Sequence, residues 1–296
     1  MTVHAHPDDE TIGTGGTMAH YAAEGVRVVC VTCTYGEMGE IVVPEMDTPG
    51  NHERLAELRQ DELARALARL GRIEHHWLGY RDSDMMGRPG NEDPRCFWQA
   101  DVHEATGRLV RLVRQLRPDV IVGYNEFGGY GHPDHIRSGQ VARLAFERAG
   151  SPEAYPDQLA DGALQPWQPT KLYESVIDMS RREEAAKLME ERGVTSWWTP
   201  SPDESEEDRI AREELMGRME AARGPVTARV DIGPWVENKL DAMREHVTQI
   251  TADGPFLVLT PDEVRRFMPT EDYTLRVSRV GVRLPEDDLF AGLRGT

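Results

Sequence analysis

The sequence predicts an α/β protein with a Rossmann-like layered fold, built on a mostly parallel sheet and joined to a smaller α+β C-terminal part. Through the first half, apolar stretches rich in β-branched residues alternate with amphipathic stretches of helical period, and this alternation is typical of a parallel sheet with helices on its faces. At 296 residues, 39% of them hydrophobic, the chain can bury a large core. The second half is less regular, so we expect a soft boundary near residue 150 between regions 1–150 and 151–296.

Four strands are expected in the first half, each marked by a short apolar run. They are TVHAH, VRVVCVTCT, EHHWLGY and DVIVGYN, at residues 2–6, 26–34, 74–80 and 119–125. Each is followed by a helix-like stretch, and in the one at residues 52–71 the apolar residues recur at spacings of three and four. The expected helices span residues 11–25, where glycines precede the helical pattern, and residues 52–71, 102–118 and 135–150. Gly25, Gly71 and Pro118 are the expected stop signals.

The second half contains two strand-like and three helix-like stretches. The strands are expected at residues 171–180 and 226–232, and the helices at residues 181–193, 205–224 and 234–250. The sequence SWW places Trp197 and Trp198 between two of these helices. These rings are expected either to line a pocket for a substrate group or to pack in the core or against another subunit.

The charge of the chain argues against some classes of partner. The net charge is −18, and such a surface repels nucleic acid and anionic membranes. No apolar run approaches the roughly 20 residues of a membrane span, and no basic segment with an apolar signal core stands at the N-terminus. We therefore expect a cytoplasmic protein with neither nucleic acid nor membrane as a partner. The sequence is compatible with a homo-oligomer.

The three cysteines do not form a disulfide framework. Cys30 and Cys33 make a C-x-x-C pair inside the expected strand at residues 26–34, and Cys96 stands alone. We expect the pair to be small core residues, with a redox or metal role as the alternative.

Metal-binding residue types follow two of the expected strands. The sequence HPDDE at residues 6–10 follows the first strand, and GGYGHPDH at residues 128–135 follows the strand at residues 119–125. Ligands of such sheets bind at the carboxyl ends of the strands. We therefore expect the two segments to converge at one edge of the sheet.

The chemistry of these residues suits a catalytic divalent metal. His6 and Asp9 lie three residues apart across a turn, and either His132 or His135 supplies a third ligand. Two imidazoles and one carboxylate, with a fourth position open for water, are typical of catalytic zinc. The same set also suits Fe²⁺.

The remaining polar side chains then have catalytic roles available to them. Asp8, beside the metal, is expected to act as the general base on water. The histidine of HPDH that does not bind metal is expected to protonate the leaving group or to stabilise an oxyanion. Asp134 would fix the tautomer of that imidazole, and Tyr130 would donate its hydroxyl to the oxyanion.

Each motif also has a plainer explanation. A lone H-x-x-D or H-P-D-H is common in turns, and only the pairing of two such turns after two strands of one sheet favours a metal site. The sequence GTGG at residues 13–16 could indicate a nucleotide loop, but it does not match G-x-G-x-x-G and no P-loop lysine is present. We expect these glycines to let the backbone pass close to the metal loop.

Five segments together carry a resemblance to a known family. They are HAHPDDE, TYGEMGE, LRQDELARALARLG, YRDSDM and GGYGHPDH, and they resemble the PIG-L/LmbE-like superfamily of zinc-dependent de-N-acetylases. The resemblance implies a hydrolase of an amide on a glucosamine-type nitrogen. It implies that region 1–150 carries the metal and that region 151–296 completes the substrate pocket.

By matching positions, the resemblance implies His6, Asp9 and His135 as zinc ligands, Asp8 as general base and His132 as the assisting imidazole. Tyr130 and Asp134 match supporting positions. Arg59, Glu40 and Asp82 match positions that contact the sugar or its partner ring, although Arg59 could be a surface arginine and Asp82 a turn residue. His246 and Gln249, in the sequence HVTQI, are expected to close over the substrate or to belong to a capped surface helix.

Within the superfamily, the chain is most similar to the mycothiol S-conjugate amidase branch. The segments that carry this likeness are GEMGEIVVPEMD, EHHWLGYRDS and residues 268–293. The alternatives are an N-acetylglucosaminyl-inositol deacetylase, a natural-product sugar N-deacetylase and, outside enzymes, a metal-dependent sugar-binding protein. The amidase pattern carries a lysine soon after HPDDE, where this chain reads TIGTGGT.

Overall fold

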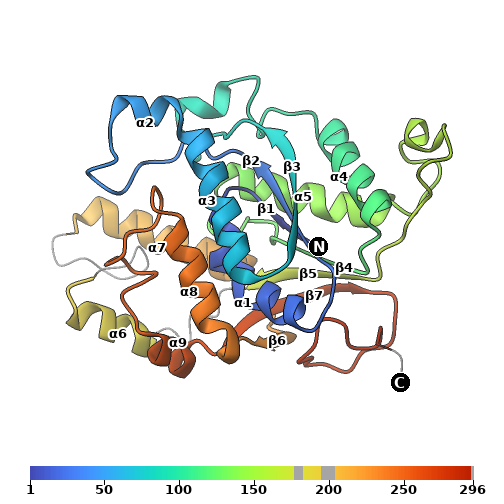
Figure 1. The fold of residues 1–296 in the computed structure, drawn as a ribbon. Helices are drawn as coiled ribbons and strands as arrows, with labels where there is room; N and C mark the ends of the chain where they lie inside the picture. The colour runs from blue at the N-terminus through green and yellow to red at the C-terminus, as the bar shows by residue number, and fades with distance from the viewer. Residues whose placement is uncertain (177–182, 195–203, 295–296) are drawn as a thin grey trace.

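A seven-stranded sheet runs through the centre of the molecule (Figure 1). The computed structural model describes residues 1–176, 183–194 and 204–294. The strands are β1 (Thr2–His4), β2 (Val28–Thr34), β3 (Ile73–Tyr80), β4 (Val120–Gly123), β5 (Lys171–Val176), β6 (Ala228–Asp231) and β7 (Thr270–Ser278). Their order across the sheet is β3-β2-β1-β4-β5-β7-β6. The pairs from β3 to β5 are parallel, and β7 lies antiparallel between β5 and β6, which confirms the expected mostly parallel α/β fold.

Helices cover both faces of this sheet (Figure 1). They are α1 (Asp9–Ala23), α2 (Pro49–Glu53), α3 (Leu55–Leu70), α4 (Val102–Leu116), α5 (Pro133–Arg148), α6 (Glu183–Glu191), α7 (Glu206–Ala222), α8 (Val236–Glu245) and α9 (Pro261–Phe267). One core joins α4 and α5 to the sheet, as with Leu109 and Phe146, and another joins α1 and α3 to the opposite face, as with Met18 and Leu63.

The strand β2 contributes side chains to both cores. Cys33 packs in the core under α4 and α5, whereas Cys30 packs in the core under α1 and α3. Successive residues of a strand point to opposite faces, and the two cysteines are an odd number of positions apart. Both are fully buried free thiols, so the prediction that they are core residues is confirmed.

The second half of the chain extends the same sheet. β5 pairs with β4 across the expected boundary near residue 150, and a third core packs α6, α8 and α9 together through residues such as Met189, Leu240 and Val264. The strand expected at residues 171–180 is described only to Val176. Trp197 and Trp198 lie outside the described residues.

Some boundaries differ from the expectation. The helix expected at residues 52–71 is two helices, because Thr48 caps a short first one and Arg54 interrupts the helical backbone at φ −118° and ψ 21°. The helix expected at residues 234–250 ends at Glu245. We predicted neither α9 nor β7. The sequence of β7 does not resemble a buried strand, because it carries charged side chains at buried positions, such as Glu271 and Asp272.

The glycines of GTGG lie inside α1, whereas we expected them to precede the helical pattern and to let the backbone pass close to the metal loop. Glu271 of β7 accepts hydrogen bonds from the backbone N–H groups of Gly16 (3.0 Å) and Thr17 (2.8 Å). Lys239 of α8 donates to the Ile12 carbonyl (2.8 Å) and to Glu271 (2.6 Å). The Lys239–Glu271 ion pair is therefore hydrogen-bonded to the backbone in the middle of α1. The GTGG glycines belong to this packed helix, and the structure does not support the nucleotide-loop interpretation.

Two glycines of α1 offer a matched test of this packing. A Cβ on Gly16 would lie 2.6 Å from Ile232 Cβ, whereas a Cβ on Gly13 would meet nothing within 4 Å. We expect Gly16→Ala to lower the free energy of unfolding by about 1–3 kcal/mol through overpacking. Gly13→Ala should raise it by up to about 1 kcal/mol, since alanine is the better helix former. Urea unfolding of both variants measures this, and equal effects would contradict the close packing of Gly16.

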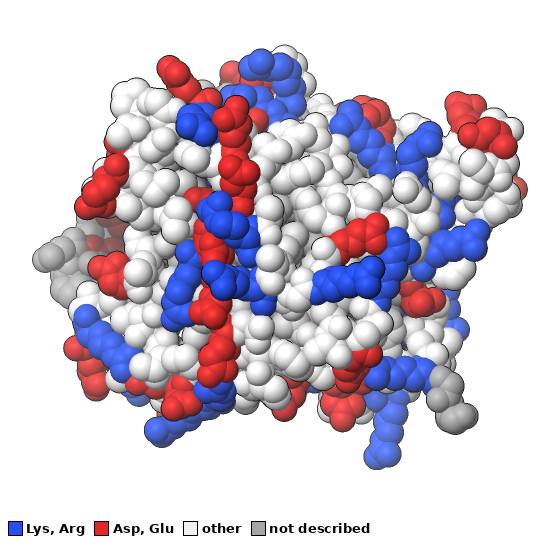
Figure 2. Space-filling model, viewed as in Figure 1, with Lys and Arg blue, Asp and Glu red and all other residues white. Residues whose placement is uncertain are grey.

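Acidic and basic side chains are interleaved on the face that Figure 2 shows, which is the face of α3 and α8. Arg65 and Arg69 of α3 both bond to Glu245 of α8, at 3.0 Å and 2.7 Å. These charges join two helices rather than forming a field of one sign on this face. Among the described residues, no helix is long and apolar enough to cross a lipid bilayer.

Candidate metal centre and active-site cavity

The two polar loops meet where the strand order reverses. β2 and β3 extend the sheet to one side of β1, and β4 and β5 extend it to the other. β1 and β4 are parallel neighbours, with Thr2 opposite Val122, so their carboxyl ends lie side by side. Such a reversal is where doubly wound sheets bind ligands. The loop that leaves β1 carries His6, the loop that leaves β4 leads to His135, and the two histidines come together with Asp9 as expected.

His6, Asp9 and His135 each offer a ligand atom within 4.8 Å of the others. The Asp9 carboxylate lies between the rings, with Oδ2 3.5 Å from His6 Nδ1 and Oδ1 3.3 Å from His135 Nε2. Gly128 permits this arrangement, because its φ is +65° and a Cβ there would lie 2.6 Å from His135 Cβ. The donor set is the one that catalytic zinc uses when a fourth position is open.

A carboxylate behind His6 orients its ring. His6 Nε2 lies 3.2 Å from Asp134 Oδ2, and Ser83 donates its backbone N–H (2.9 Å) and its hydroxyl to the same carboxylate. A carboxylate on the far nitrogen of an imidazole fixes the tautomer and strengthens the other nitrogen as a metal ligand. We expected the Asp134 carboxylate to hold an imidazole of HPDH, but the structure places it on His6.

The charges at this point of the molecule suit a cation. Although burial lowers it, the carboxylates of Asp82, Asp134 and Asp9 raise the pKa of His6 well above its usual range. Burial raises the pKa of Asp9, but His135 and His6 outweigh it and hold that pKa well below its usual range. Asp9 therefore stays ionised, and a divalent cation can take the place of the proton that this negative environment favours on His6.

A second group of candidate ligands overlaps the first. His6, Asp82, His132 and Asp134 also offer ligand atoms within 4.8 Å of one another. Their atoms already have partners: Asp82 Oδ1 accepts from the Asp84 N–H at 2.8 Å, and His132 Nδ1 accepts from the Asp134 N–H at 3.1 Å. A metal here would also break the bond between His6 Nε2 and Asp134 Oδ2 (3.2 Å), whereas the first group can use His6 Nδ1, which faces Asp9, and leaves that bond in place. The first group is therefore the better fit.

Asp8 is held beside the metal ligands in an unusual backbone conformation. Its φ is +116°, which is rare for a residue other than glycine. Arg59 fixes the loop, since its guanidinium donates to the carbonyls of Pro7 (2.5 Å) and Gly36 (2.7 Å) and lies 3.3 Å from Asp8 Oδ2. Burial raises the pKa of Asp8 to about 6, against the opposing charge of Arg59. A carboxylate tuned in this way suits proton transfer near neutral pH.

His132 and Tyr130 present hydrogen-bond donors to the same cavity. His132 Nδ1 accepts the Asp134 N–H, so a neutral ring carries its proton on Nε2. Burial, with the neighbouring His6 and His135, holds the pKa of His132 well below its usual range, so the neutral ring is favoured. Burial and the nearby carboxylates raise the pKa of Tyr130, whose hydroxyl lies 3.4 Å from His135 Nε2. Of our two expectations for His132, the neutral donor to an oxyanion fits this geometry better than the protonated acid.

The residues expected to contact substrate have different positions. Asp82 is buried and lines the cavity, as does Arg59, which is therefore not a surface arginine. Glu40 and Gln249 lie at the cavity wall, where the Gln249 amide donates to the Glu40 carbonyl at 3.1 Å. His246 is fully buried, is absent from the cavity wall and bonds to Glu10 at 2.8 Å. The expectation that His246 closes over the substrate is therefore wrong, because α8 ends just before it and turns its ring toward α1.

The cavity at this site has a volume of about 770 Å³ and two kinds of wall. Near the candidate ligands the wall is polar, and it includes Asp8, Arg59, Asp82, Asp84, Arg88 and Tyr130. Away from them it becomes apolar, with side chains from α6 to α9 that include Met189, Met216, Met219, Met243, Phe256 and Phe267. The cavity is large enough for a substrate of two rings, with an apolar arm beyond.

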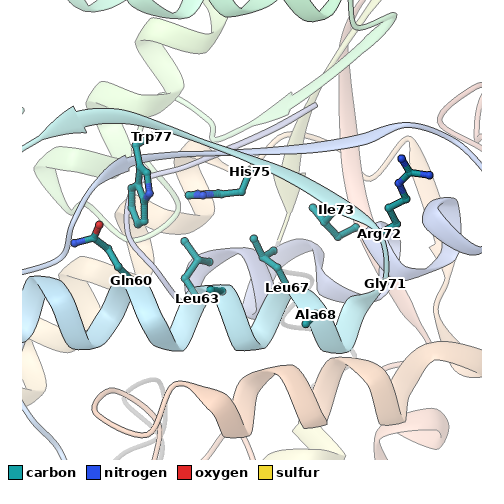
Figure 3. Close-up of a pocket in the computed structure, with 10 residues that line it drawn as sticks. Gln60, Leu63, Leu67, Ala68, Gly71, Arg72, Ile73, His75 and Trp77 are labelled. Carbon is teal, nitrogen blue, oxygen red and sulfur yellow. The ribbon is translucent and has the colours of Figure 1, made fainter.

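A second hollow, of about 400 Å³, lies between α3 and the edge strand β3 (Figure 3). Leu63 and Leu67 of α3 face Ile73, His75 and Trp77 of β3 there. His75 bonds to Thr32 at 3.0 Å, and burial lowers its pKa to about 4. The hollow contains neither of the candidate metal groups found among the described residues, so the chemistry belongs to the larger cavity.

Three residues near the site were not given a role from the sequence. Ser83 holds Asp134, and Glu10 accepts the Asp8 N–H at 2.9 Å. His4, which belongs to the first cluster, bonds instead to Thr14 and Tyr124 (3.0 Å and 3.3 Å). Ser83 lies in the segment YRDSDM, directly after the strand that ends at Tyr80. Its position at the carboxyl end of a strand is the feature from which a role at the site could have been predicted.

Comparison with known proteins agrees with this geometry. The sequence profile of the PIG-L family, described as GlcNAc-PI de-N-acetylase, matches residues 1–146. A protein of Nocardiopsis dassonvillei named 1D-myo-inositol 2-acetamido-2-deoxy-α-D-glucopyranoside deacetylase is 46% identical, over 99% of this chain and 100% of its own length. One of Frankia alni, named as deacetylase 1 for the same compound, is 42% identical over 98% of this chain and 99% of its own.

Solved structures share the fold at low identity. The N,N′-diacetylchitobiose deacetylase of Pyrococcus horikoshii is 21% identical and superposes with a TM-score of 0.60, covering 93% of this chain and 82% of its own. The 4-carboxy-2-hydroxymuconate hydratase of Pseudomonas putida is 16% identical, also with a TM-score of 0.60, and covers 96% and 98%. A deacetylase and a hydratase share this fold, so the fold alone does not assign the reaction.

Proposed function

We propose that the substrate of this chain, which belongs to the PIG-L family and hydrolyses N-acyl amide bonds, is 1D-myo-inositol 2-acetamido-2-deoxy-α-D-glucopyranoside, from which it releases acetate. The observation that carries the proposal is the convergence of Asp8 with the His6, Asp9 and His135 group in a cavity of about 770 Å³. The names of the relatives, which this chain matches over nearly its full length, support the substrate.

We assign the metal to His6, Asp9 and His135, and we propose Zn²⁺, with Fe²⁺ as the alternative. The metal supplies a Lewis acid that polarises the amide carbonyl and makes water nucleophilic at neutral pH. The protein contributes the rest: Asp134 and Ser83 hold the His6 ring so that Nδ1 faces Asp9.

Asp8 is the proposed proton carrier of the reaction. Its carboxylate accepts a proton from the water that attacks the amide carbon, and it can then donate this proton to the departing glucosamine nitrogen. A pKa of about 6 permits both steps near neutral pH. His132 is favoured as a neutral ring, so Asp8 is the better candidate for the acid in the second step.

Tyr130 and His132 are the proposed donors to the oxygen that becomes negative in the tetrahedral intermediate. The Tyr130 hydroxyl lies near His135 Nε2 at 3.4 Å, and the His132 Nε2–H completes the pair because Nδ1 is occupied by a backbone N–H. Fixed donors of this kind stabilise developing charge without reorganisation. The polar wall with Glu40, Asp82 and Arg88 is where sugar and inositol hydroxyls would bind.

Hydrolysis of two substrates side by side tests the proposal. We expect the zinc-loaded protein to release acetate from the acetylated glucosaminyl-inositol faster than it cleaves a mycothiol S-conjugate, as measured by acetate and free-amine release. Comparable cleavage of N-acetylglucosamine alone would contradict the requirement for inositol. Absence of cleavage of any of these compounds would contradict the substrate assignment.

The apolar arm of the cavity favours a second candidate. An acetyl group occupies little of a wall that includes Met189, Met216, Met219 and Phe267. An S-conjugate amidase, which the sequence resembles, must hold a larger acyl group that bears the conjugated apolar molecule. Faster cleavage of the S-conjugate in the same assay would support this candidate over the deacetylase.

A further inference from the structure

Glu10 and His246 form a buried pair beside the active site, and the proposed reaction does not use either of them. Both side chains are 0% exposed, and His246 Nε2 lies 2.8 Å from Glu10 Oε1. Glu10 comes from the first turn of α1, whereas His246 follows the end of α8, 236 residues later. Burial of two ionisable groups costs desolvation free energy unless the groups bond to each other. A buried pair of this kind beside the active site suggests a structural or functional role.

Glu10 joins this pair to Asp8. Its second oxygen, Oε2, accepts the backbone N–H of Asp8 at 2.9 Å. Asp8 has a φ of +116°, and a conformation of this kind costs about 1–3 kcal/mol and persists only when its surroundings hold it. The backbone of Asp8 is held by this bond on one side and, on the other, by the Thr11 hydroxyl, which donates to its carbonyl at 2.8 Å.

His246 in turn fixes the Glu10 carboxylate. The backbone of His246 belongs to a rigid turn, where its carbonyl accepts from Gln249 (3.0 Å) and Ile250 (2.9 Å). Its other ring nitrogen, Nδ1, is buried without a hydrogen-bond partner among the described residues. The side chain therefore makes its hydrogen bond with Glu10, and a chain of contacts runs from the second half of the protein to the Asp8 backbone.

We propose that Glu10 and His246 are positioning residues that hold Asp8 in its φ +116° conformation, with its carboxylate directed at the reacting water. This inference rests on the proposed role of Asp8 as proton carrier. Neither residue lines the cavity, so any effect on catalysis would be indirect, and Asp8 is the active-site residue to which the Glu10 side chain is bonded. A displacement of about 1 Å at a reacting group can cost roughly 10²-fold in rate.

The kinetic test compares three variants. We expect His246→Ala to lower kcat by about 10- to 100-fold, with KM and metal content unchanged. His246→Gln, whose amide can still donate to Glu10, should recover most of this loss. The matched control is Glu62→Gln, because Glu62 bonds the Thr248 N–H and hydroxyl at 2.9 Å and 2.7 Å, which tethers the same turn without touching Glu10.

Combination with Asp8→Asn separates positioning from a general loss of structure. If His246 acts through Asp8, His246→Ala causes no further loss in the Asp8→Asn background. An equal loss in both backgrounds, or the same loss in Glu62→Gln, would overturn the inference. A rise in KM with unchanged kcat would also overturn it, since it would indicate a substrate contact.

A measurement without substrate keeps this inference distinct from the proposed function. Amide hydrogen exchange by NMR should show that the Asp8 N–H exchanges faster in His246→Ala than in the wild type, and unchanged in Glu62→Gln. If the wild type cleaved no glucosamine amide, the proposed function would fail while this result could still support the contact chain. If His246→Ala failed to fold, Glu10→Ala, which removes the acceptor of the Asp8 N–H, would give the same readouts, and unchanged Asp8 exchange and kcat there would overturn the inference.

Discussion

The Asp8→Asn enzyme is expected to turn over about 10²–10⁴-fold more slowly than the wild type while it binds metal and substrate normally. General acid–base catalysis by one positioned side chain contributes a factor of this size. Asparagine keeps the size of aspartate and can still accept from Arg59, which lies 3.3 Å from Asp8 Oδ2. It cannot take a proton from water. Steady-state kinetics with acetate detection, together with metal analysis, measure the effect.

The expected pattern is a loss in kcat with little change in KM, because Asp8 acts on the attacking water and not on the sugar. Gln249→Ala is a contrasting variant, since Gln249 lines the cavity wall beside Glu40 and its loss should raise KM instead. If Asp8→Asn retained more than about a tenth of the wild-type kcat, Asp8 would not be the general base, and a different side chain would have to accept the proton.

The sequence predicted the site better than it predicted the boundaries of the second half. His6, Asp9 and His135 could be found because short polar segments follow strands whose carboxyl ends meet in a parallel sheet. β7 could not be found in the same way. Its buried Glu271 bonds to the amides of α1, so a charged residue that indicates solvent in the sequence is inside the protein.

The orientation of the His246 side chain could not be predicted from the sequence, for a similar physical reason. A histidine near the end of an amphipathic helix can face a pocket, the solvent or another helix, and local pattern does not separate these cases. The partner that decides its orientation, Glu10, lies 236 residues away. The same holds for Asp134, whose carboxylate was expected to hold an HPDH ring but lies 3.2 Å from His6, a contact that depends on how β1 and β4 pair.

The overlap of the two ligand groups gives the second prediction of large effect. His6 belongs to both, whereas Asp9 belongs only to the group with His135, and Asp82 only to the group with His132 and Asp134. Asp9→Ala is expected to abolish stable metal binding and to reduce activity to near background, because it removes the carboxylate that faces both imidazoles at 3.5 Å and 3.3 Å.

Asp82→Ala, by contrast, is expected to keep its metal. The Asp82 carboxylate accepts from the Asp84 N–H at 2.8 Å and lies 3.8 Å from His6 Nε2, so its role is to hold the loop and to add negative charge. Metal content per chain after zinc loading and desalting measures both variants, with circular dichroism to confirm that each is folded. Retained metal in Asp9→Ala together with lost metal in Asp82→Ala would move the centre to the second group. His132 would then be a metal ligand, so it could not be an oxyanion donor, and Tyr130 would be left as the proposed donor to the oxyanion.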